Sequence, residues 1–296
     1  MKTSKLPWLG SVSTILLLSL TAPSSYGLPI NLGSAGPSNW AVLETGAGAA
    51  NANVSIANAS NAGTINGNVG IATTGNISDS GTPVNGSVYA NTAGSINANV
   101  AANVSGSVYH NAAANLLLNQ AVSDAANAVT AALALPSTSI ANITTGGTFA
   151  HAPGVYSLSQ INLSGATLTL QGSASDYYIF NISSALTLSH ASILLSGGLT
   201  PDNVLFNITR SGGTGLGMSG GLSTESVLYG IVLANDSSVS EAPGLVVGEI
   251  ISGQNIGIAS GAQVEGLSVP DGGSSITLLS MGCGLIILAR KKLLSK

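Results

Sequence analysis

The residues that could perform catalysis are few in this chain and lie far apart along it. Apart from Asp271, all of the 11 acidic residues fall between Glu44 and Glu265, and the nearest pair, Asp236 and Glu241, is five positions apart. Glycoside hydrolysis needs two carboxyl groups at a set separation, and calcium binding needs several oxygen ligands in one loop. The 3 histidines are isolated from one another as well. The sequence therefore predicts no catalytic residues, no metal site and no cofactor, and a polysaccharide-active enzyme is the least favoured function.

The scarcity of charge excludes two further kinds of partner. Only 6% of the residues are charged, against about 25% in ordinary soluble domains. Arg210 is the only basic residue between Leu28 and Pro270. Nucleic-acid binding requires a cluster of lysine and arginine residues that neutralises phosphates. We therefore expect no nucleic acid and no other large anion as a partner.

Polar and aromatic residues that recur at a spacing of 20 could instead bind a surface. The candidates for such a binding face are four hydroxyl residues, Thr167, Thr169, Thr187 and Ser189, and an alternative aromatic column, Tyr89 and Tyr109. Stacked hydroxyl and methyl groups would suit ice, and stacked rings would suit sugars. Two plainer explanations stay open, because threonine favours strands and tyrosines often pair across neighbouring strands.

Glycines at a nearly constant spacing indicate a repeating fold that would position these residues. Gly67, Gly86 and Gly106 are spaced 19 and 20 apart, and a second series begins at Gly230 and recurs at intervals of 18. This period, with alternating apolar residues, suits a coil of three short strands and three turns, the unit of a β-solenoid. We predict an all-β, right-handed β-solenoid over residues 28–268, with on the order of ten coils about 4.8 Å apart.

Alternation along the strands assigns side chains to the interior or the surface. Val84, Gly86, Val88 and Ala90 should point inward, and Tyr89 should point outward. Glycine at the repeated inward position would leave room in a narrow interior. Gly86→Val should therefore be costly, because it forces a branched side chain into a packed space.

One alanine-rich segment breaks the strand pattern. Residues 111–135 contain no glycine or proline, and Pro136 follows them. Apolar residues step by three or four through this segment, as on one face of an amphipathic helix; they are Leu118, Val122, Ala125, Val129 and Leu133. We predict one long helix, 111–135, packed along the side of the solenoid.

The N-terminal 27 residues have the layout of a secretory signal peptide. Lys2 and Lys5 precede an apolar run at 15–20, and Ser25-Tyr26-Gly27 provides small residues for cleavage. The protein is therefore expected to be secreted through the Sec pathway, with a mature chain that begins near Leu28.

The C-terminal segment, 269–296, has the features of a sorting signal. Val269-Pro270-Asp271-Gly272-Gly273 precedes an uncharged run at 276–289, and Arg290, Lys291 and Lys292 follow as a basic stop. As a helix that run would span roughly 21 Å, less than the roughly 30 Å of a bilayer core. The basic end should stay cytoplasmic, so the segment would hold the protein in the inner membrane only transiently.

This segment resembles the VPDSG-CTERM variant of the PEP-CTERM sorting signal, although Gly272 stands where the family usually has serine. The resemblance implies processing by an exosortase-type membrane peptidase in a Gram-negative producer of exopolysaccharide. An ordinary C-terminal anchor helix is the alternative. Cys283, the only cysteine, lies in this segment, so the exported domain should contain no disulfide.

The body of the chain resembles the bacterial ice-binding-like β-solenoid family, and similar coils occur in choice-of-anchor A proteins. The resemblance rests on short motifs; they include the opening Leu32 to Leu43, Pro153-Gly-Val-Tyr156, Tyr178-Ile-Phe-Asn181 and Asn203-Val-Leu-Phe206. It implies a discontinuous solenoid, in which the N-terminal segment completes the end formed by the late coils. We predict a non-catalytic protein of the cell surface, envelope or extracellular matrix, with exopolysaccharide or ice as its partner. Ice binding proper is the alternative function.

Overall fold

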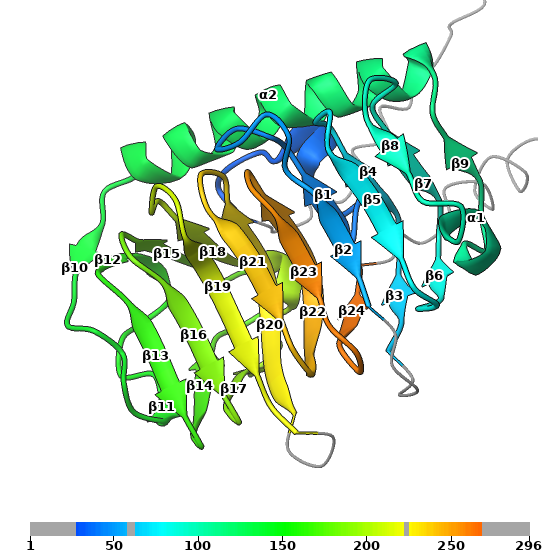
Figure 1. Ribbon diagram of the computed structural model, residues 1–296. Helices are drawn as coiled ribbons and strands as arrows, with labels where there is room; N and C mark the ends of the chain where they lie inside the picture. The colour runs from blue at the N-terminus through cyan, green and yellow to red at the C-terminus, as the bar shows by residue number, and fades with distance from the viewer. Residues whose placement is uncertain (1–27, 58–62, 222–224, 268–296) are drawn as a thin grey trace, which may run out of the picture.

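The computed structural model describes residues 28–57, 63–221 and 225–267. Within these ranges the chain is mostly β structure in parallel sheets, with one long helix (Figure 1). The predicted signal peptide, 1–27, and the predicted sorting segment, 269–296, lie outside the described residues. No helix in the described ranges is both long and apolar enough to cross a membrane.

The strands form one sheet of 16 strands and one of 8 strands. The larger sheet covers two of the three sides of the stack, and these two sides are called its first and second face. Its first face contains, in spatial order, β10 (Thr138–Ser139), β12 (Gly154–Leu158), β15 (Tyr178–Ile182), β18 (Val204–Ile208), β20 (Ser226–Ala234), β22 (Gly244–Ser252), β1 (Val42–Glu44), β4 (Val69–Ile71), β7 (Val88–Ala90) and β9 (Val108–Tyr109). Its second face shares β20 and β22 and adds β11 (Gly147–Thr148), β14 (Thr167–Gln171), β17 (Ser192–Ser196), β24 (Gln263–Glu265), β3 (Ile65–Asn66) and β6 (Val84–Asn85).

The eight-stranded sheet forms the third face of the molecule. Its strands, in spatial order, are β13 (Ile161–Ser164), β16 (Leu186–Ser189), β19 (Thr214–Ser219), β21 (Ser238–Glu241), β23 (Ile256–Ile258), β2 (Val54–Ile56), β5 (Asn76–Asp79) and β8 (Ser95–Ile96). The helical elements are η1 (Gly33–Ala35), α1 (Val100–Asn103), α2 (Ala112–Ala134) and η2 (Pro201–Asn203). One coil of the chain thus visits all three faces, as β12, β13 and β14 do.

Most of the spacings seen in the sequence correspond to parallel strand pairs. Asn66 pairs with Asn85, 19 positions later, and Gly230 pairs with Gly248, 18 positions later. Ile179 pairs with Leu205, 26 positions later, so the coil between them is longer. The coils are therefore unequal in length.

The chain enters the stack in its middle. β1 pairs with β22 on one side and with β4 on the other, which places Val42 between Ile250 and Val69. The early coils continue from there to β9, and α2 then runs back along the stack to β10 at the opposite end (Figure 1). This is the discontinuous arrangement that the family resemblance implies.

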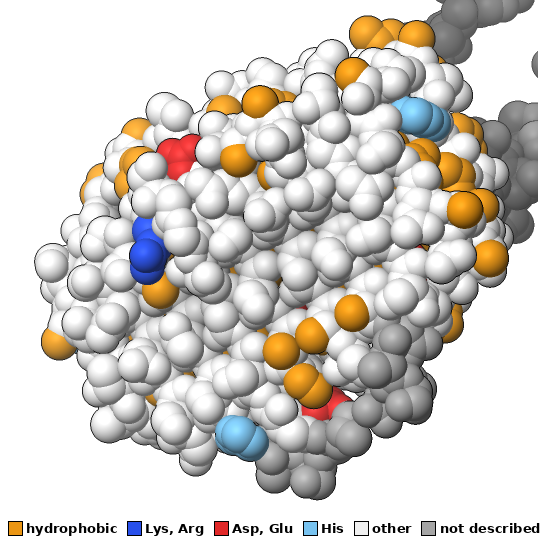
Figure 2. Space-filling view, in the orientation of Figure 1, with side chains coloured by type: hydrophobic (Ala, Val, Ile, Leu, Met, Phe, Trp, Pro, Cys, Tyr) orange, Lys and Arg blue, Asp and Glu red, His pale blue; other side chains and the backbone are white. Residues whose placement is uncertain are grey.

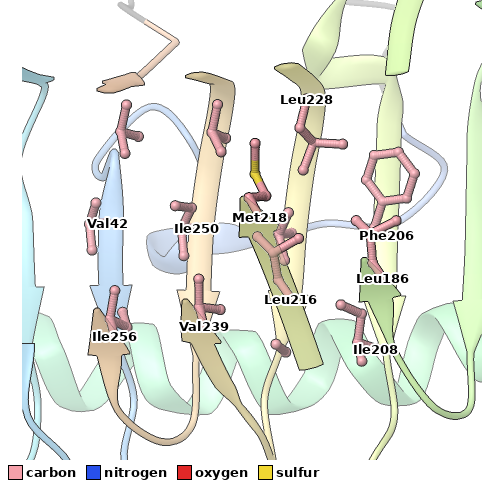
Figure 3. Close-up of a cluster of buried hydrophobic side chains, with 14 of the residues drawn as sticks. Val42, Leu186, Phe206, Ile208, Leu216, Met218, Leu228, Val239, Ile250 and Ile256 are labelled. Atoms are coloured by element: carbon pink, nitrogen blue, oxygen red, sulfur yellow. The ribbon is translucent and has the colours of Figure 1, made fainter. Parts of the chain in front are cut away.

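Apolar side chains from all three faces fill the interior of the stack. Val42, Phe206, Ile250 and Ile256 are among the fully buried residues that meet there (Figure 3). Near the β10 end the filling is aromatic, because Phe180 lies between Tyr156 and Phe206 with ring centroids 5.8 and 5.5 Å apart.

The predicted helix forms with almost the predicted bounds, and Leu118 and Ala125 are buried as predicted, but the rest of its buried face differs. The side chain of Asn111 accepts a hydrogen bond from the backbone N–H of Ala114 and caps its start. Its buried residues are Ala114, Leu118, Ala121, Ala125, Ala128 and Ala132. Leu133, predicted to be buried, is 53% exposed, and Val122 and Val129 are only half-buried. Alanines face the sheet because its own large side chains, such as Ile179 and Leu205, already fill the space beneath the helix.

The predicted alternation in β6 and β7 is confirmed for Val84, Val88 and Ala90, which are fully buried. The reason for glycine at position 86 differs from the prediction. A Cβ atom there would meet the backbone of Gly67 in the neighbouring coil, whereas the prediction invoked space in the interior. Gly86 therefore permits close approach of two stacked coils.

Candidate surface-binding face

The outer surface of the eight-stranded sheet carries one row of glycine and uncharged polar residues in continuous register. The row consists of Asn162, Thr187, Gly217, Ser240, Gly257, Ser55 and Ser78. In parallel strands such positions recur about every 4.8 Å. In the space-filling view most of this side is white and few side chains are charged, while hydrophobic side chains are visible around the margin and in one group on its lower part (Figure 2). The result is a flat, uncharged surface that is periodic along the stack.

Hydrogen bonds between coils hold one border of this face. The backbone N–H of Asn53 donates to Asn255 Oδ1 at 2.8 Å, and that of Asn76 donates to Asn53 Oδ1 at 2.7 Å. The hydroxyl of Ser95 then donates to Asn76 Oδ1 at 3.0 Å. These bonds bridge four consecutive coils and keep their spacing regular.

The predicted stacking of Thr167 on Thr187 and of Thr169 on Ser189 is wrong. Thr187 and Ser189 lie in β16 on the eight-stranded sheet, whereas Thr167 and Thr169 lie in β14 on the larger sheet. Thr167 pairs instead with Ser192, 25 positions later. An offset of 20 in a coil of 25 residues stops five residues short of the stacked position, on the preceding face, so the two threonines belong to different surfaces.

The predicted aromatic column exists, but most of it is covered. Tyr89 and Tyr109 are stacked with centroids 4.7 Å apart, and Trp40 contacts Tyr89 edge-on at 5.2 Å. Tyr89 is half-buried, and burial raises its pKa. Tyr109 is 38% exposed, so only this ring of the three offers substantial surface to a ligand.

Among the residues that the structure describes, the acidic and histidine side chains are not gathered into a site. Asp236 is exposed in a turn, whereas Glu241 is fully buried. The Nε of Arg210 donates to the carbonyl of Gly212 at 2.8 Å. In the parts of the chain that the structure describes, no three His, Cys, Asp or Glu residues are placed to hold a metal ion.

Three buried glutamates were not recognised in the sequence. Glu44 accepts hydrogen bonds from the Thr73 hydroxyl at 2.9 Å and from its backbone N–H at 3.3 Å, yet burial still raises its pKa from 4.5 to about 7. Burial raises the pKa of Glu241 and Glu249 well above the ordinary value. Both Glu249 carboxyl oxygens lack a partner among the described residues. In the sequence, the position of Glu249 within the apolar run 245–251 was the feature that could have indicated its burial.

The stacked parallel coils, the helix along one side and the polar face define a β-rich protein with an ordered, repeating surface. The family model described as Ice-binding-like matches residues 49–262, so the chain belongs to the ice-binding-like family. A second model, the VPDSG-CTERM motif, matches residues 268–293. Both family resemblances are thus confirmed, and the second motif indicates export and association with the cell envelope.

Solved structures show the same fold. An ice-binding protein of the Antarctic ascomycete Antarctomyces psychrotrophicus is 26% identical, with a TM-score of 0.56, over 81% of this chain and 99% of that one. An ice-binding protein of an Arctic yeast is 17% identical, with a TM-score of 0.55, over 83% and 96%. One of Shewanella frigidimarina is 18% identical, with a TM-score of 0.52, over 80% and 97%. These relatives are described as ice-binding proteins. A search of curated proteins gives no match.

Proposed function

We propose that this chain is an exported, non-catalytic protein of the cell surface or extracellular matrix, and that the outer face of its eight-stranded sheet binds ice. The observation that carries the proposal is the row from Asn162 to Ser78, seven small residues in continuous register. Hydroxyl groups and exposed backbone at a constant spacing suit an ordered array of water molecules. The ascomycete relative, at 26% identity, supports this choice of ligand.

The fold supports the proposal by making the face rigid. We infer that the stacked coils wind as a right-handed β-solenoid, in which each strand between the two ends of a sheet is held by parallel neighbours on both sides. Asn53 and Asn76 add hydrogen bonds between coils at the border of the face. A rigid array loses little conformational entropy when it meets a crystalline surface.

Replacing Thr187 by tyrosine should abolish most of the ice-binding activity. Thr187 is exposed in the row between Asn162 and Gly217, so a large ring would stand above the flat surface. Thermal hysteresis and inhibition of ice recrystallisation by the full chain are the measurements. Thr167→Tyr is the matched control, because Thr167 is also exposed but lies on the larger sheet. Equal losses in the two variants, or an inactive wild type, would refute ice binding by this face.

The two terminal signals predict the processed form of the protein. We infer that removal of residues 1–27 leaves Leu28 as the first residue, and that an exosortase-type peptidase cuts near Asp271 within the sorting signal. The match to the VPDSG-CTERM motif over residues 268–293 supports the second cut. Mass spectrometry of the native protein should find a chain of about 28–271. An intact end at Lys296 in a soluble extracellular fraction would contradict this processing.

A further inference from the structure

A groove runs along the corner where the second face of the larger sheet meets its helix-covered face. The groove has a volume of about 430 Å³. It spans three successive coils, represented by Glu265, Asn66 and Asn85, and residues 37–40 wall one side. At about 4.8 Å per coil it extends along the stack for roughly 10 Å. It lies away from the eight-stranded sheet, so it is separate from the proposed ice-binding face.

Two rows of polar side chains flank the groove. In the first row, Asn66 Nδ2 donates to Glu265 Oε1 at 2.8 Å, and Asn85 Nδ2 donates to Asn66 Oδ1 at 2.6 Å. In the second row, Asn68 Oδ1 accepts from the backbone N–H of Ser87 at 2.8 Å. Each row is therefore fixed in place by bonds from one coil to the next.

Glycines form the floor between the rows. A Cβ atom at Gly86 would meet the backbone of Gly67, and one at Gly67 would lie 2.8 Å from the Cβ of Ala41. The floor is consequently bare backbone, and only the flanking rows project from it. Such a channel admits a narrow, extended ligand.

The rows leave hydrogen-bond acceptors unused. The first row uses Glu265 Oε1 and the amide of Asn85, while Glu265 Oε2 and Asn85 Oδ1 have no partner among the described residues. Acceptors of this kind bind hydroxyl donors. Arg210, the only basic residue in the described ranges, is tied to Gly212 and lines no part of the groove. A negatively charged ligand would meet the Glu265 carboxylate with no cation to compensate.

An exposed aromatic ring belongs to the coil that stacks on the Asn85 coil at one end of the groove. Ser107 continues the second row through its backbone N–H, which donates to Ser87 Oγ at 3.1 Å. Tyr109 follows two residues later, with its ring 38% exposed and its other side stacked on Tyr89. A flat ring held in this way offers an apolar surface to the C–H face of a sugar.

We propose that this groove binds a neutral, extended polysaccharide, with Glu265 and Asn85 accepting hydrogen bonds from sugar hydroxyls and Tyr109 stacking on a sugar ring. Successive sugar units of an extended β-linked chain would lie beside successive coils. This site goes beyond ice binding, because it uses another surface and another ligand.

Calorimetric titration of the full chain with cellohexaose tests the site. Wild type should bind this neutral probe, and Asn85→Ala and Tyr109→Ala should each raise Kd at least about tenfold, equivalent to about 1.4 kcal/mol. Thr187→Tyr on the eight-stranded sheet should leave Kd unchanged. An alginate hexamer, as an anionic probe, should bind at least about tenfold more weakly than cellohexaose.

Circular dichroism identifies any variant that fails to fold. If Asn85→Ala fails to fold, binding of cellohexaose can still be measured with Tyr109→Ala and the conservative Glu265→Gln, because both side chains lie at the surface. No binding of cellohexaose by wild type would overturn the proposal. The proposal would also be overturned if the groove variants bound cellohexaose as tightly as wild type does, or if Thr187→Tyr weakened this binding as much as the groove variants do. Ice activity is measured separately, so failure of either site is distinguishable.

Discussion

Glu249→Gln is expected to raise the free energy of unfolding by several kcal/mol at pH 8 and to leave it nearly unchanged at pH 4. Glu249 is fully buried, and its carboxyl oxygens have no hydrogen-bond partner among the described residues. Its neighbour across the sheet is Ile231, which is also buried. Burial therefore raises the pKa of Glu249 well above its ordinary value. Glutamine has nearly the same size but carries no charge at any pH.

The direction of the pH effect follows from proton linkage. Below the unfolded-state pKa near 4.5, the carboxyl group is protonated in both the folded and the unfolded protein, so it causes no pH dependence. Above that value the unfolded chain releases its proton while the folded protein keeps it. Each further pH unit then lowers the free energy of unfolding by about 1.4 kcal/mol until the folded-state pKa is reached. For Glu44 this window ends at about pH 7.

Urea unfolding of wild type and variant between pH 4 and pH 8 measures this effect. Asp124→Asn is a control of opposite sign, because the backbone N–H of Ser34, at 2.7 Å, lowers the pKa of Asp124. That variant should be less stable than wild type at pH 7, with the difference shrinking as the pH falls through the lowered pKa. If the free energies of unfolding of wild type and Glu249→Gln changed with pH in parallel, the pKa of Glu249 would not be raised in the folded protein, and the prediction would be wrong.

Gly86→Val is expected to lower the free energy of unfolding by about 3 kcal/mol, the upper end of the usual range for overpacking. A Cβ atom at position 86 would lie 2.9 Å from the backbone nitrogen of Asn68 and closer still to the carbonyl of Gly67. Both obstacles are backbone atoms of the next coil, so no side-chain rotation relieves the clash. The coils would have to separate, which weakens the pairing of β3 with β6.

Gly257→Val is the matched control for this substitution. Its Cβ atom would meet only the carbonyl oxygen of Val239, at 3.9 Å, and would point outward from the eight-stranded sheet. Because valine favours strands, this change should alter the free energy of unfolding by no more than about 0.5 kcal/mol. Thermal and chemical unfolding should therefore rank the two variants clearly. Equal destabilisation would mean that the backbone contact at Gly86 is not the cause.

Several features of the fold were predictable because they depend on neighbouring residues in the chain. The alanine-rich segment without glycine or proline predicts the helix to within one residue at each end, 112–134 against 111–135. Alternation in residues 84–90 predicts which side chains are buried, since strand side chains point to opposite faces in turn. The glycine spacing of 18 to 20 predicts stacked coils, because that period with alternating apolar residues fits a coil of three short strands and three turns.

The candidate sites were much less predictable. Thr167 and Thr187 looked equivalent because they share a local pattern at a spacing of 20, but the coil between them has 25 residues. The row that includes Ser240 and Ser55 joins strands that are remote in the sequence, through β23. Neither relation follows from local pattern, because the lengths of the turns decide which residues become neighbours.

The sequence by itself determined the stacked-coil plan, the single long helix and the near absence of positive charge, together with the terminal motif that indicates export. These properties depend on composition and on residues a few positions apart. Only the tertiary structure decided that Glu249 is buried with no partner among the described residues, and that residues from seven strands share one face. The physical reason is that parallel strands pair through backbone groups, which carry no residue identity. Register between distant strands is therefore set by loop lengths and by the burial of whole faces, and these exist only once the chain is folded.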